Sequence, residues 1–253
     1  MKQRGTIELN KSANKNQPPS VTLLMPVLNE INGLKLSLPF IRRDLFDDIL
    51  VVDGGSKDGS VEYVEEMKIR HIRQRRPGLA FAVFDAVVEL KTDYVIEFSP
   101  DGNCLVEDLP KIVERISAGY DLVVVSRYLP PAKSEDDNVV TAFGNWMFTR
   151  LISVLGRFPI TDALTIYRGF RRDIATDPDF IHYLKGPVFE PLISAMASMK
   201  NLKICEIPGN EPKRIGGESK MRIFYNGYCI SIMILRCYLN KFIRNIIFTK
   251  RTK

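Results

Sequence analysis

Short, strongly apolar runs recur along the first half of the chain, and each breaks into polar residues at its C-terminal end. Val21–Leu28, Ile49–Asp53 and Tyr94–Phe98 are such runs, and their β-branched content is typical of buried parallel strands. Helical periodicity occupies the segments between and beside them, namely 32–45, 60–67 and 79–90. This alternation predicts an α/β domain with a Rossmann-like, mostly parallel central sheet and flanking helices.

The polar residues at the three strand ends include carboxylates beside glycines. The first two strands lead into Asn29-Glu30 and Gly54-Gly55-Ser56, and the third leads into residues 99–103. Open α/β sheets bind ligands at this edge, and glycine lets a ligand approach the backbone closely. Asp53 is therefore a candidate ligand-binding carboxylate, with a turn or helix-capping role as the alternative. Asp58 is expected to cap the following helix.

Two more strands are expected further along the chain. Leu122–Val125 is a buried strand that ends at Ser126-Arg127-Tyr128, and Lys203–Pro208 reads as an edge strand. An arginine at a strand end can grip a phosphate bidentately, although a surface salt bridge is the alternative. Residues 129–139 form a loop that is expected to cover the site, and residues 214–220 form a glycine-containing cationic loop.

Together these motifs resemble a known family. The chain is similar to family 2 glycosyltransferases with the GT-A fold, within the group of polyprenyl-phosphate (dolichol-phosphate-type) sugar transferases. The resemblance spans about Val21 to Met221 and keeps the family's order. The matching segments are Pro26–Glu30, Val51–Ser60, Ser99–Asn103, Val125–Tyr128, Asp162–Arg171 and Gly217–Lys220.

The resemblance implies a site for a nucleotide sugar, with either a UDP- or a GDP-sugar as donor. Asp53 would accept hydrogen bonds from the base or ribose, and Gly55 and Gly78 would let the donor approach the backbone. Gly78 fits a helix entry equally well, and Glu30 fits a solvated glutamate. The remaining residues implied on the donor side are Pro26, Leu28, Arg168 and Ser219.

The resemblance also implies a Mg²⁺ or Mn²⁺ ion that stabilises the leaving diphosphate. Most relatives carry Asp-x-Asp at this strand end, whereas this chain has Ser99-Pro100-Asp101. Asp101 is therefore the expected metal ligand, and the missing first carboxylate puts the strength of metal binding in question. Ser99 and Asn103 are expected to contribute weakly or through water.

On the acceptor side, the resemblance places Arg127 and Lys220 near phosphate groups, with Arg168 or Arg171 as further candidates. Asp162 would lie at the acceptor side of the sugar, and Glu190 would lie near the sugar. A phosphate acceptor is already ionised at neutral pH and needs positioning, whereas a hydroxyl acceptor needs a base. Asp162 is the expected base in the hydroxyl case.

Composition locates the positive charge at one end of the chain. The 253 residues carry a net charge of +6, but residues 213–253 contain ten Lys or Arg and one acidic residue. This distribution and the absence of a basic-aromatic motif argue against nucleic-acid binding.

Four scattered cysteines and two histidines predict reduced thiols and no zinc site. Residues 1–20 are polar, and we expect a flexible leader without a signal peptide.

The segment Met221–Phe248 is apolar but interrupted by charges, too often to span a bilayer. As a helix it separates Arg222, Arg236 and other polar residues from an apolar side with Leu235 and Leu239. We expect residues 222–253 to lie in the interface of an anionic membrane. The alternative is docking on the domain itself or on a partner subunit. Gly227 is expected to split the segment into two helices.

The sequence thus predicts an inverting glycosyltransferase domain over residues 21–221, peripheral on the cytosolic membrane face. It would move sugar from a nucleoside diphosphate to a lipid-linked acceptor, above all a polyprenyl phosphate. One alternative is transfer to a glycan or lipid-linked oligosaccharide hydroxyl. Another is a non-catalytic nucleotide-sugar-binding subunit. A homo-oligomer or a membrane subunit partner remains open.

Overall fold

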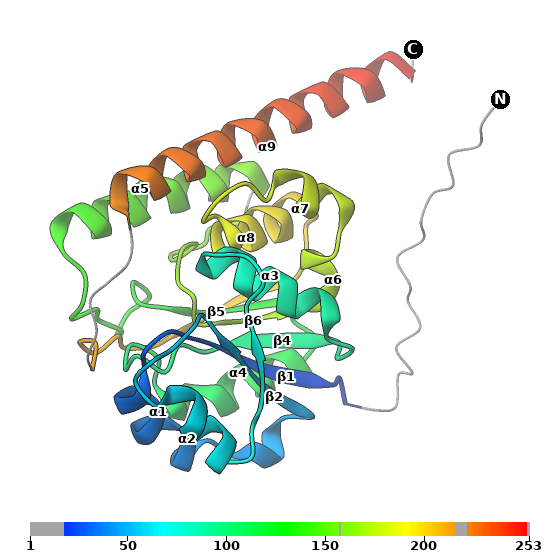
Figure 1. Cartoon of the computed structure of the whole chain (residues 1–253). Coiled ribbons are helices and arrows are strands. Elements are labelled where there is room, and N and C mark those ends of the chain that lie inside the picture. Colours follow the sequence, from blue (N-terminus) through cyan, green and yellow to red (C-terminus); the bar gives the residue numbers. More distant parts are fainter. Residues whose placement is uncertain (1–17, 157, 216–221, 252–253) are drawn as a thin grey trace.

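The computed structural model describes residues 18–156, 158–215 and 222–251, the last nine of these by their backbone only. Seven strands in this part of the chain form one sheet in the order β3-β2-β1-β4-β6-β5-β7 (Figure 1). Only β6 among them runs antiparallel to its neighbours. The strands are β1 Val21–Val27, β2 Asp48–Asp53, β3 Arg70–Arg73, β4 Tyr94–Glu97, β5 Leu122–Ser126, β6 Arg168–Arg171 and β7 Ile204–Pro208.

Helices cover both faces of the sheet, which confirms the expected α/β architecture. Alternate residues of β1 show the two faces: Leu23 and Met25 pack with α1, α2 and α4, whereas Leu24 packs with α3 and α8. The helices are α1 Ile31–Ser37, α2 Ser60–Glu66, α3 Leu79–Glu89, α4 Leu109–Ser117, α5 Val139–Gly156, α6 Arg172–Ala175, α7 Pro178–Tyr183, α8 Phe189–Met199 and α9 Ile223–Arg251.

The helix expected over residues 32–45 is much shorter than the pattern suggested. It ends at Ser37 and is followed by two short 3₁₀ turns, Leu38–Phe40 and Arg43–Leu45. Pro39 explains the break, because proline has no N–H to donate and its ring clashes with the preceding turn of a helix. The helices expected over 60–67 and 79–90 are confirmed to within one residue.

An outer layer of two long helices, α5 and α9, lies beyond α8 (Figure 1). Gly156 allows α5 to pack closely, since a Cβ there would meet Ser198 of α8 at 2.2 Å. The helix α9 runs unbroken through Gly227, so the expected split there is wrong. Its residues Ile230, Met233 and Cys237 belong to the same core as α8, so residues 230–237 of the tail pack on the domain.

The sheet topology decides where the site lies. Since β1, β2, β4, β5 and β7 are parallel, their carboxyl ends share one edge. The antiparallel β6 brings its first residue, Arg168, to that same edge, opposite Glu97. Loops from strands far apart in the sequence therefore meet there, as the sequence predicts for the first three strands.

Candidate active site at the carboxyl edge of the sheet

The ends of β1 and β2 are joined by a set of side-chain to backbone hydrogen bonds. Ser56 Oγ accepts from the N–H of Asn29 at 2.9 Å, and Asn29 Oδ1 accepts from the N–H of Lys57 at 2.8 Å. Asp58 accepts from Ser60 and from the N–H of Ile31, whereas the α2 N-cap position is Gly59. The two turns therefore form one rigid unit. Asp58 joins them and, one residue before the N-cap position, also accepts from the backbone N–H of Ser60, the first residue of α2.

Asp53 is 2% exposed and holds the glycine turn after β2. Its carboxylate accepts from the backbone N–H groups of Gly55 and Ser56, both at 2.9 Å, and Arg73 lies 3.5 Å away. Gly55 has φ +106°, a conformation that favours glycine. In this structure Asp53 thus fulfils the turn role that the sequence left open, and it stays at the strand edge where a ligand would bind.

The other donor-side residues lie around this unit. Leu28 packs against Gly54, whose Cβ would meet it at 3.2 Å, and Pro26 lies in β1 opposite Val52. Gly78 is the N-cap residue of α3 with φ +100°, and a Cβ there would meet nothing within 4 Å. Gly78 therefore has the helix-entry role, with open space beside it.

Asp101, the expected metal ligand, follows β4 and is 5% exposed. Its Oδ2 pairs with Arg214 Nη2 at 2.9 Å, and Arg214 Nη1 lies 3.8 Å from Glu30 Oε1. The N–H of Ile215 donates to the backbone oxygen of Asp101 at 2.8 Å. A loop that follows β7 thus lies over the end of β4, and Arg214 bridges it to the end of β1.

The residues around Asp101 fit a hard divalent cation only in part. No cluster of three or more His, Cys, Asp or Glu side chains arranged for a metal occurs in the described part of the chain. However, Asn103 Oδ1 is buried and meets no partner there, while its backbone N–H donates to Asp101 Oδ1 at 3.1 Å. Mg²⁺ in proteins commonly takes one or two carboxylates plus substrate phosphates. A carboxylate beside an orphaned amide oxygen meets that requirement.

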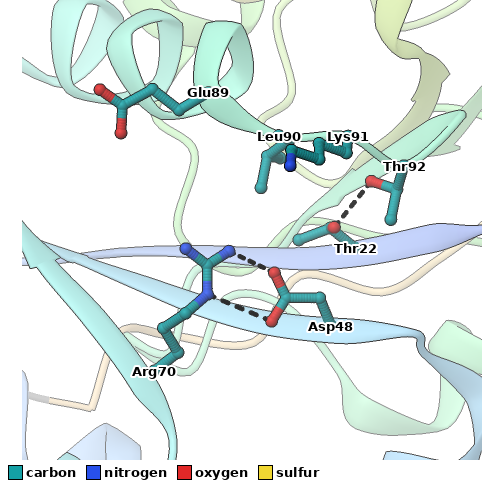
Figure 2. A pocket seen from close by; sticks show the side chains of 7 residues that line it. All are labelled: Thr22, Asp48, Arg70, Glu89, Leu90, Lys91 and Thr92. Carbon is teal, nitrogen blue, oxygen red and sulfur yellow. Dashed lines mark hydrogen bonds and ion pairs between the residues drawn. The ribbon is translucent and has the colours of Figure 1, made fainter.

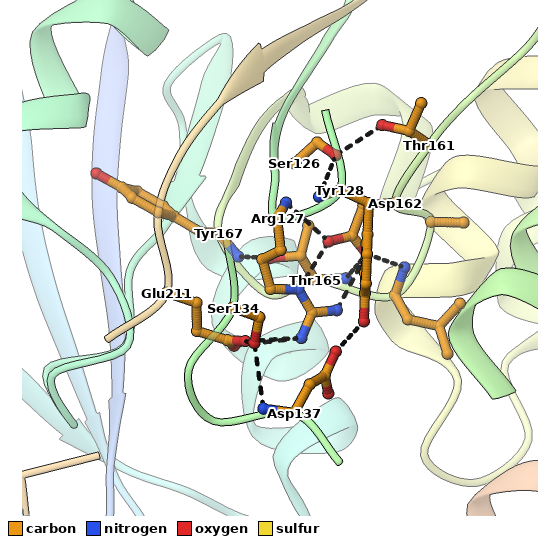
Figure 3. A network of polar contacts seen from close by, with 12 residues as sticks. Ser126, Arg127, Tyr128, Ser134, Asp137, Thr161, Asp162, Thr165, Tyr167 and Glu211 are labelled. Carbon is orange, nitrogen blue, oxygen red and sulfur yellow. Dashed lines mark hydrogen bonds and ion pairs between the residues drawn. The ribbon is translucent and has the colours of Figure 1, made fainter. Parts of the chain in front are cut away.

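Arg127 at the end of β5 is held by two carboxylates (Figure 3). Its Nε and Nη2 donate to Asp162 at 2.7 and 3.1 Å, and its Nη1 donates to Glu211 at 3.2 Å. Burial alone would lower the pKa of Arg127, but Asp162 and then Glu211 raise it above its usual value. Burial raises the pKa of Glu211, against the opposing effect of Arg127. The arginine is therefore charged and fixed in direction.

Asp162 is fully buried, and its carboxylate is committed to Arg127 and to the N–H of Thr165. A general base needs an oxygen that can reach the acceptor proton. In this arrangement Asp162 positions Arg127 and does not fit the role of base that the sequence suggested. Glu211 was missed by the sequence analysis, because its place beside Arg127 depends on β7 pairing with β5.

The loop after Arg127 is pinned over this network, as expected for residues 129–139 (Figure 3). Tyr128 donates its hydroxyl to Asp137, and Ser134 Oγ donates to Glu211 and accepts from the N–H of Asp137. At its far side, Asp136 Oδ2 accepts from Asn103 Nδ2 at 2.9 Å. The loop therefore connects the ends of β4, β5 and β7.

Arg168 and Arg171 do not lie where the resemblance placed them. Arg168 is fully buried between β6 and α8, and its guanidinium donates to the backbone oxygens of Thr165 and Glu190 and to Ser194. Arg171 pairs with Asp121 at the opposite end of the sheet. The cause is that successive residues of β6 face opposite sides of the sheet. Gly169 faces Ile112 of α4, and a Cβ at position 169 would lie 2.6 Å from that side chain. Arg168 therefore faces the other side, toward α8.

Two carboxyl groups lie close to Arg168. Glu97 of β4 is fully buried, and neither of its carboxyl oxygens has a partner among the described residues. Burial, and then the charge of Glu190, raises the pKa of Glu97 well above its usual range. Glu190 is the second residue of α8 and is partly exposed; burial also raises its pKa, against the opposing effect of Arg168. Ser219 and Lys220 lie outside the described residues.

A surface hollow of about 320 Å³ lies at the other edge of the sheet. Figure 2 shows that Arg70 and Asp48 form an ion pair along one wall of it, with Thr22, Thr92 and Lys91 nearby. It is far from the strand ends that carry the polar network, since Thr22 and Asp48 lie at the amino ends of β1 and β2. We therefore assign it no part in the site.

Comparisons with known proteins identify the family of the chain. The family model described as "Glycosyl transferase family 2" matches residues 22–177. The chain belongs to this family. It is a glycosyltransferase, so the reading as a non-catalytic subunit loses its support.

Two relatives carry names from the expected group, and a third is named only as a glycosyltransferase. An undecaprenyl-phosphate mannosyltransferase of Micrococcus luteus is 29% identical over 79% of this chain and 87% of its own length. A dolichyl-phosphate hexose transferase of Haloferax volcanii is 28% identical over 88% of this chain and 96% of its own. Glycosyltransferase AglJ of the same archaeon is 29% identical over 63% of this chain, which spans only 53% of that protein.

A solved structure confirms the fold. Glucosyl-3-phosphoglycerate synthase from Mycobacterium tuberculosis superimposes with a TM-score of 0.63 at 16% identity, covering 87% of this chain and 80% of that one. That protein was crystallised with Mn²⁺, UDP and glucosyl-3-phosphoglycerate. At this identity the likeness shows the GT-A fold alone, and the expected fold class is correct.

Proposed function

We propose that this glycosyltransferase moves a sugar from a UDP- or GDP-sugar to a polyprenyl phosphate, with inversion at the anomeric carbon. The observation that carries the proposal is Arg127, a charged guanidinium fixed at the site edge by the buried Asp162. A planar guanidinium suits a phosphate group, because it can donate two parallel hydrogen bonds. The names of relatives that act on lipid phosphates support the same acceptor.

The order of the strands supports a direction for the donor. The β1–β2 turns, Asp101 and Arg127 follow one another along the edge, because β4 and β6 separate β1 from β5. Three strand intervals of about 4.8 Å put β5 about 14 Å from β1. A nucleotide held at Asp53 would therefore extend its diphosphate past Asp101 and its sugar toward Arg127.

The reaction would be one displacement at the sugar. An oxygen of the acceptor phosphate forms a bond to the anomeric carbon while the bond to the donor diphosphate breaks, and the nucleoside diphosphate leaves. Arg127 would orient the acceptor phosphate, and Arg214, already at the end of β4, would face the departing diphosphate. A divalent cation held by Asp101 and Asn103 would neutralise charge on that leaving group.

A hydroxyl acceptor keeps one specific observation in its favour. Glu190 is partly exposed, and burial raises its pKa, which brings a carboxylate closer to the value that suits a general base. Transfer to a glycan hydroxyl would then require Glu190, whereas transfer to a phosphate would not. Glu190→Gln would lower activity by about 10²-fold or more for a hydroxyl acceptor. The same substitution would change the activity with a phosphate acceptor much less.

We further propose that the enzyme lies on the cytosolic face of a membrane through α5 and α9. Both helices are apolar on their outer sides as well as toward the core, with Phe143 60% and Phe224 90% exposed. Among the described helices, α5 alone is long and apolar enough to cross a bilayer, and 28% of it is buried. The exposed Arg222, just before α9, and the exposed Arg236 on α9 suit anionic lipid head groups.

The decisive experiment offers UDP- and GDP-sugars with a short polyprenyl phosphate in detergent, with Mg²⁺ or Mn²⁺, and follows the lipid product. The matched control acceptor is the same polyprenol without its phosphate. Product from the phosphate alone supports the proposal. Product from the free alcohol would favour the hydroxyl reaction, and donor binding without turnover of any acceptor would overturn the proposed transfer.

A further inference from the structure

The strand end that carries Asp101 lacks a second carboxylate of its own, because Ser99 stands where relatives carry aspartate. The structure brings another carboxylate to this place from the loop before α5. Asn103 donates its Nδ2 to Asp136 Oδ2 at 2.9 Å and its backbone N–H to Asp101 Oδ1 at 3.1 Å. One residue thus joins two carboxylates that are 35 positions apart in the chain.

Asn103 also has an oxygen with nothing to bind. Its Oδ1 atom is shielded from solvent and has no hydrogen-bond partner within the described ranges. A buried carbonyl oxygen without a partner costs free energy, so such an atom calls for a ligand. Hard divalent cations take carboxylate and amide oxygens as ligands. The orphaned oxygen therefore makes Asn103, whose backbone N–H contacts Asp101, a candidate cation ligand.

Contacts on both sides of Asp136 hold the loop in place. Asp137 accepts from the hydroxyl of Tyr128, and the backbone N–H of Glu135 donates to the backbone oxygen of Glu211 at 2.8 Å. These contacts fix the residues on both sides of Asp136. Asp136 itself is exposed, so a cation arriving from solvent reaches its carboxylate directly.

We propose that Asp136 supplies the carboxylate that Ser99 lacks, so that the cation is held by Asp101, Asp136 and Asn103 Oδ1. This inference rests on the proposed function, which includes a divalent cation with the donor diphosphate. In the absence of a cation, Arg214 neutralises Asp101, although its own Nε is buried without a partner among the described residues. The cation takes over that neutralisation, and the guanidinium becomes available to the diphosphate.

The test measures Mn²⁺ binding itself, by the electron paramagnetic resonance signal of free Mn²⁺ during titration with UDP or GDP present. Asp136→Asn keeps the size of the side chain and removes its charge. It is expected to weaken Mn²⁺ binding by about tenfold or more, since even outer partners of a metal site contribute 10–100-fold. Glu135→Gln removes the same charge one residue away and is expected to change the affinity less than about twofold.

A second pair of variants makes the test specific. Ser99→Asp restores the two-carboxylate strand end, so Mn²⁺ binding to Ser99→Asp/Asp136→Asn is expected to return to the wild-type level. Equal losses in Asp136→Asn and Glu135→Gln would overturn the inference, because they would reflect net charge only. Failure of Ser99→Asp to restore binding, in a variant with unchanged thermal unfolding, would also overturn it.

The failure of the proposed function is distinguishable from this outcome. Calorimetric titration of the wild type with UDP and GDP, with Mn²⁺ or with a chelator, reports nucleotide binding separately. A wild type that binds nucleotide but no Mn²⁺ overturns the cation site and leaves the transfer reaction standing. A wild type that binds neither nucleotide overturns the proposed function and the inference with it.

Discussion

Glu97 provides the sharpest test of the charges buried beneath the site. Its side chain is fully buried in β4, its two carboxyl oxygens have no partner among the described residues, and burial raises its pKa well above the usual range. The neighbouring Arg168 directs its N–H groups at backbone oxygens and at Ser194, not at Glu97. We therefore expect Glu97 to be protonated in the folded protein at neutral pH, and Glu97→Gln to imitate that state.

The sign of the pH dependence follows from proton binding. Between the unfolded and the folded pKa of Glu97, the folded state keeps a proton that the unfolded state has lost. The free energy of unfolding therefore falls as the pH rises, by at most about 1.4 kcal/mol for each unit by which the folded pKa exceeds the unfolded value. This stability is fully present below the unfolded pKa and is lost as the pH rises through the folded pKa. Glu97→Gln removes the dependence.

Urea unfolding at pH 5, 6, 7, 8 and 9 measures the effect. The variant should gain stability relative to the wild type as the pH rises, whereas Glu135→Gln, an exposed carboxylate, should follow the wild type. If Glu97 is instead ionised and paired with Arg168, removing its charge leaves a buried guanidinium unpaired. The variant would then be less stable by about 3–5 kcal/mol at every pH, and the reasoning would be refuted.

Four further substitutions test the site, the packing and the membrane face. Arg127→Lys keeps the charge but loses the two parallel N–H donors of the guanidinium, so the KM for polyprenyl phosphate should rise about tenfold. Asp162→Asn should raise this KM by a similar factor, because it releases Arg127 from its fixed direction. Steady-state kinetics measures both values, and unchanged KM values would exclude Arg127 from the acceptor site. Gly156→Ala should lower the free energy of unfolding in urea by about 1–3 kcal/mol, because the added Cβ would clash with the backbone of Ser198. Gly144→Ala in the same helix should leave this free energy unchanged, since a Cβ there meets nothing within 4 Å. Phe143→Asp should reduce the fraction of protein that sediments with anionic vesicles. The control is Phe40→Asp, at a similarly exposed phenylalanine on the other side of the sheet. If Phe143→Asp sediments as much as the wild type, docking on a partner subunit is favoured instead.

The strands and their shared edge could be predicted from the sequence, because each apolar run ends in residues that a strand interior excludes. Ile49–Asp53 carries both signals, a β-branched run and a Gly-Gly turn, and β2 ends at Asp53. The early end of α1 was not predicted, although Pro39 carried the signal, since proline cannot continue a helix. Where a single residue decides the local backbone, the sequence is sufficient.

Side-chain direction was harder to predict at β6. The motif Arg168-Gly169-Phe170-Arg171 offers two arginines and no apolar alternation that would show which one turns inward. The choice is made by contacts across the fold, because α4 leaves space only for glycine at position 169. Arg168 consequently serves the interior, where it fixes the segment that carries Asp162, and not the substrate.

The charges of the site were beyond sequence reasoning for a similar reason, since they come from loops that only the sheet order brings together. Arg127 is balanced by Asp162 and Glu211, and Arg214 is balanced by Asp101. Without a bound substrate, the positive charge of each arginine is therefore already neutralised by a carboxylate. A donor diphosphate would have to exchange places with a carboxylate. A divalent cation held at Asp101, as we propose, would make that exchange favourable, because it would replace Arg214 there and neutralise charge on the diphosphate. We therefore expect donor and cation to bind together more tightly than either one alone.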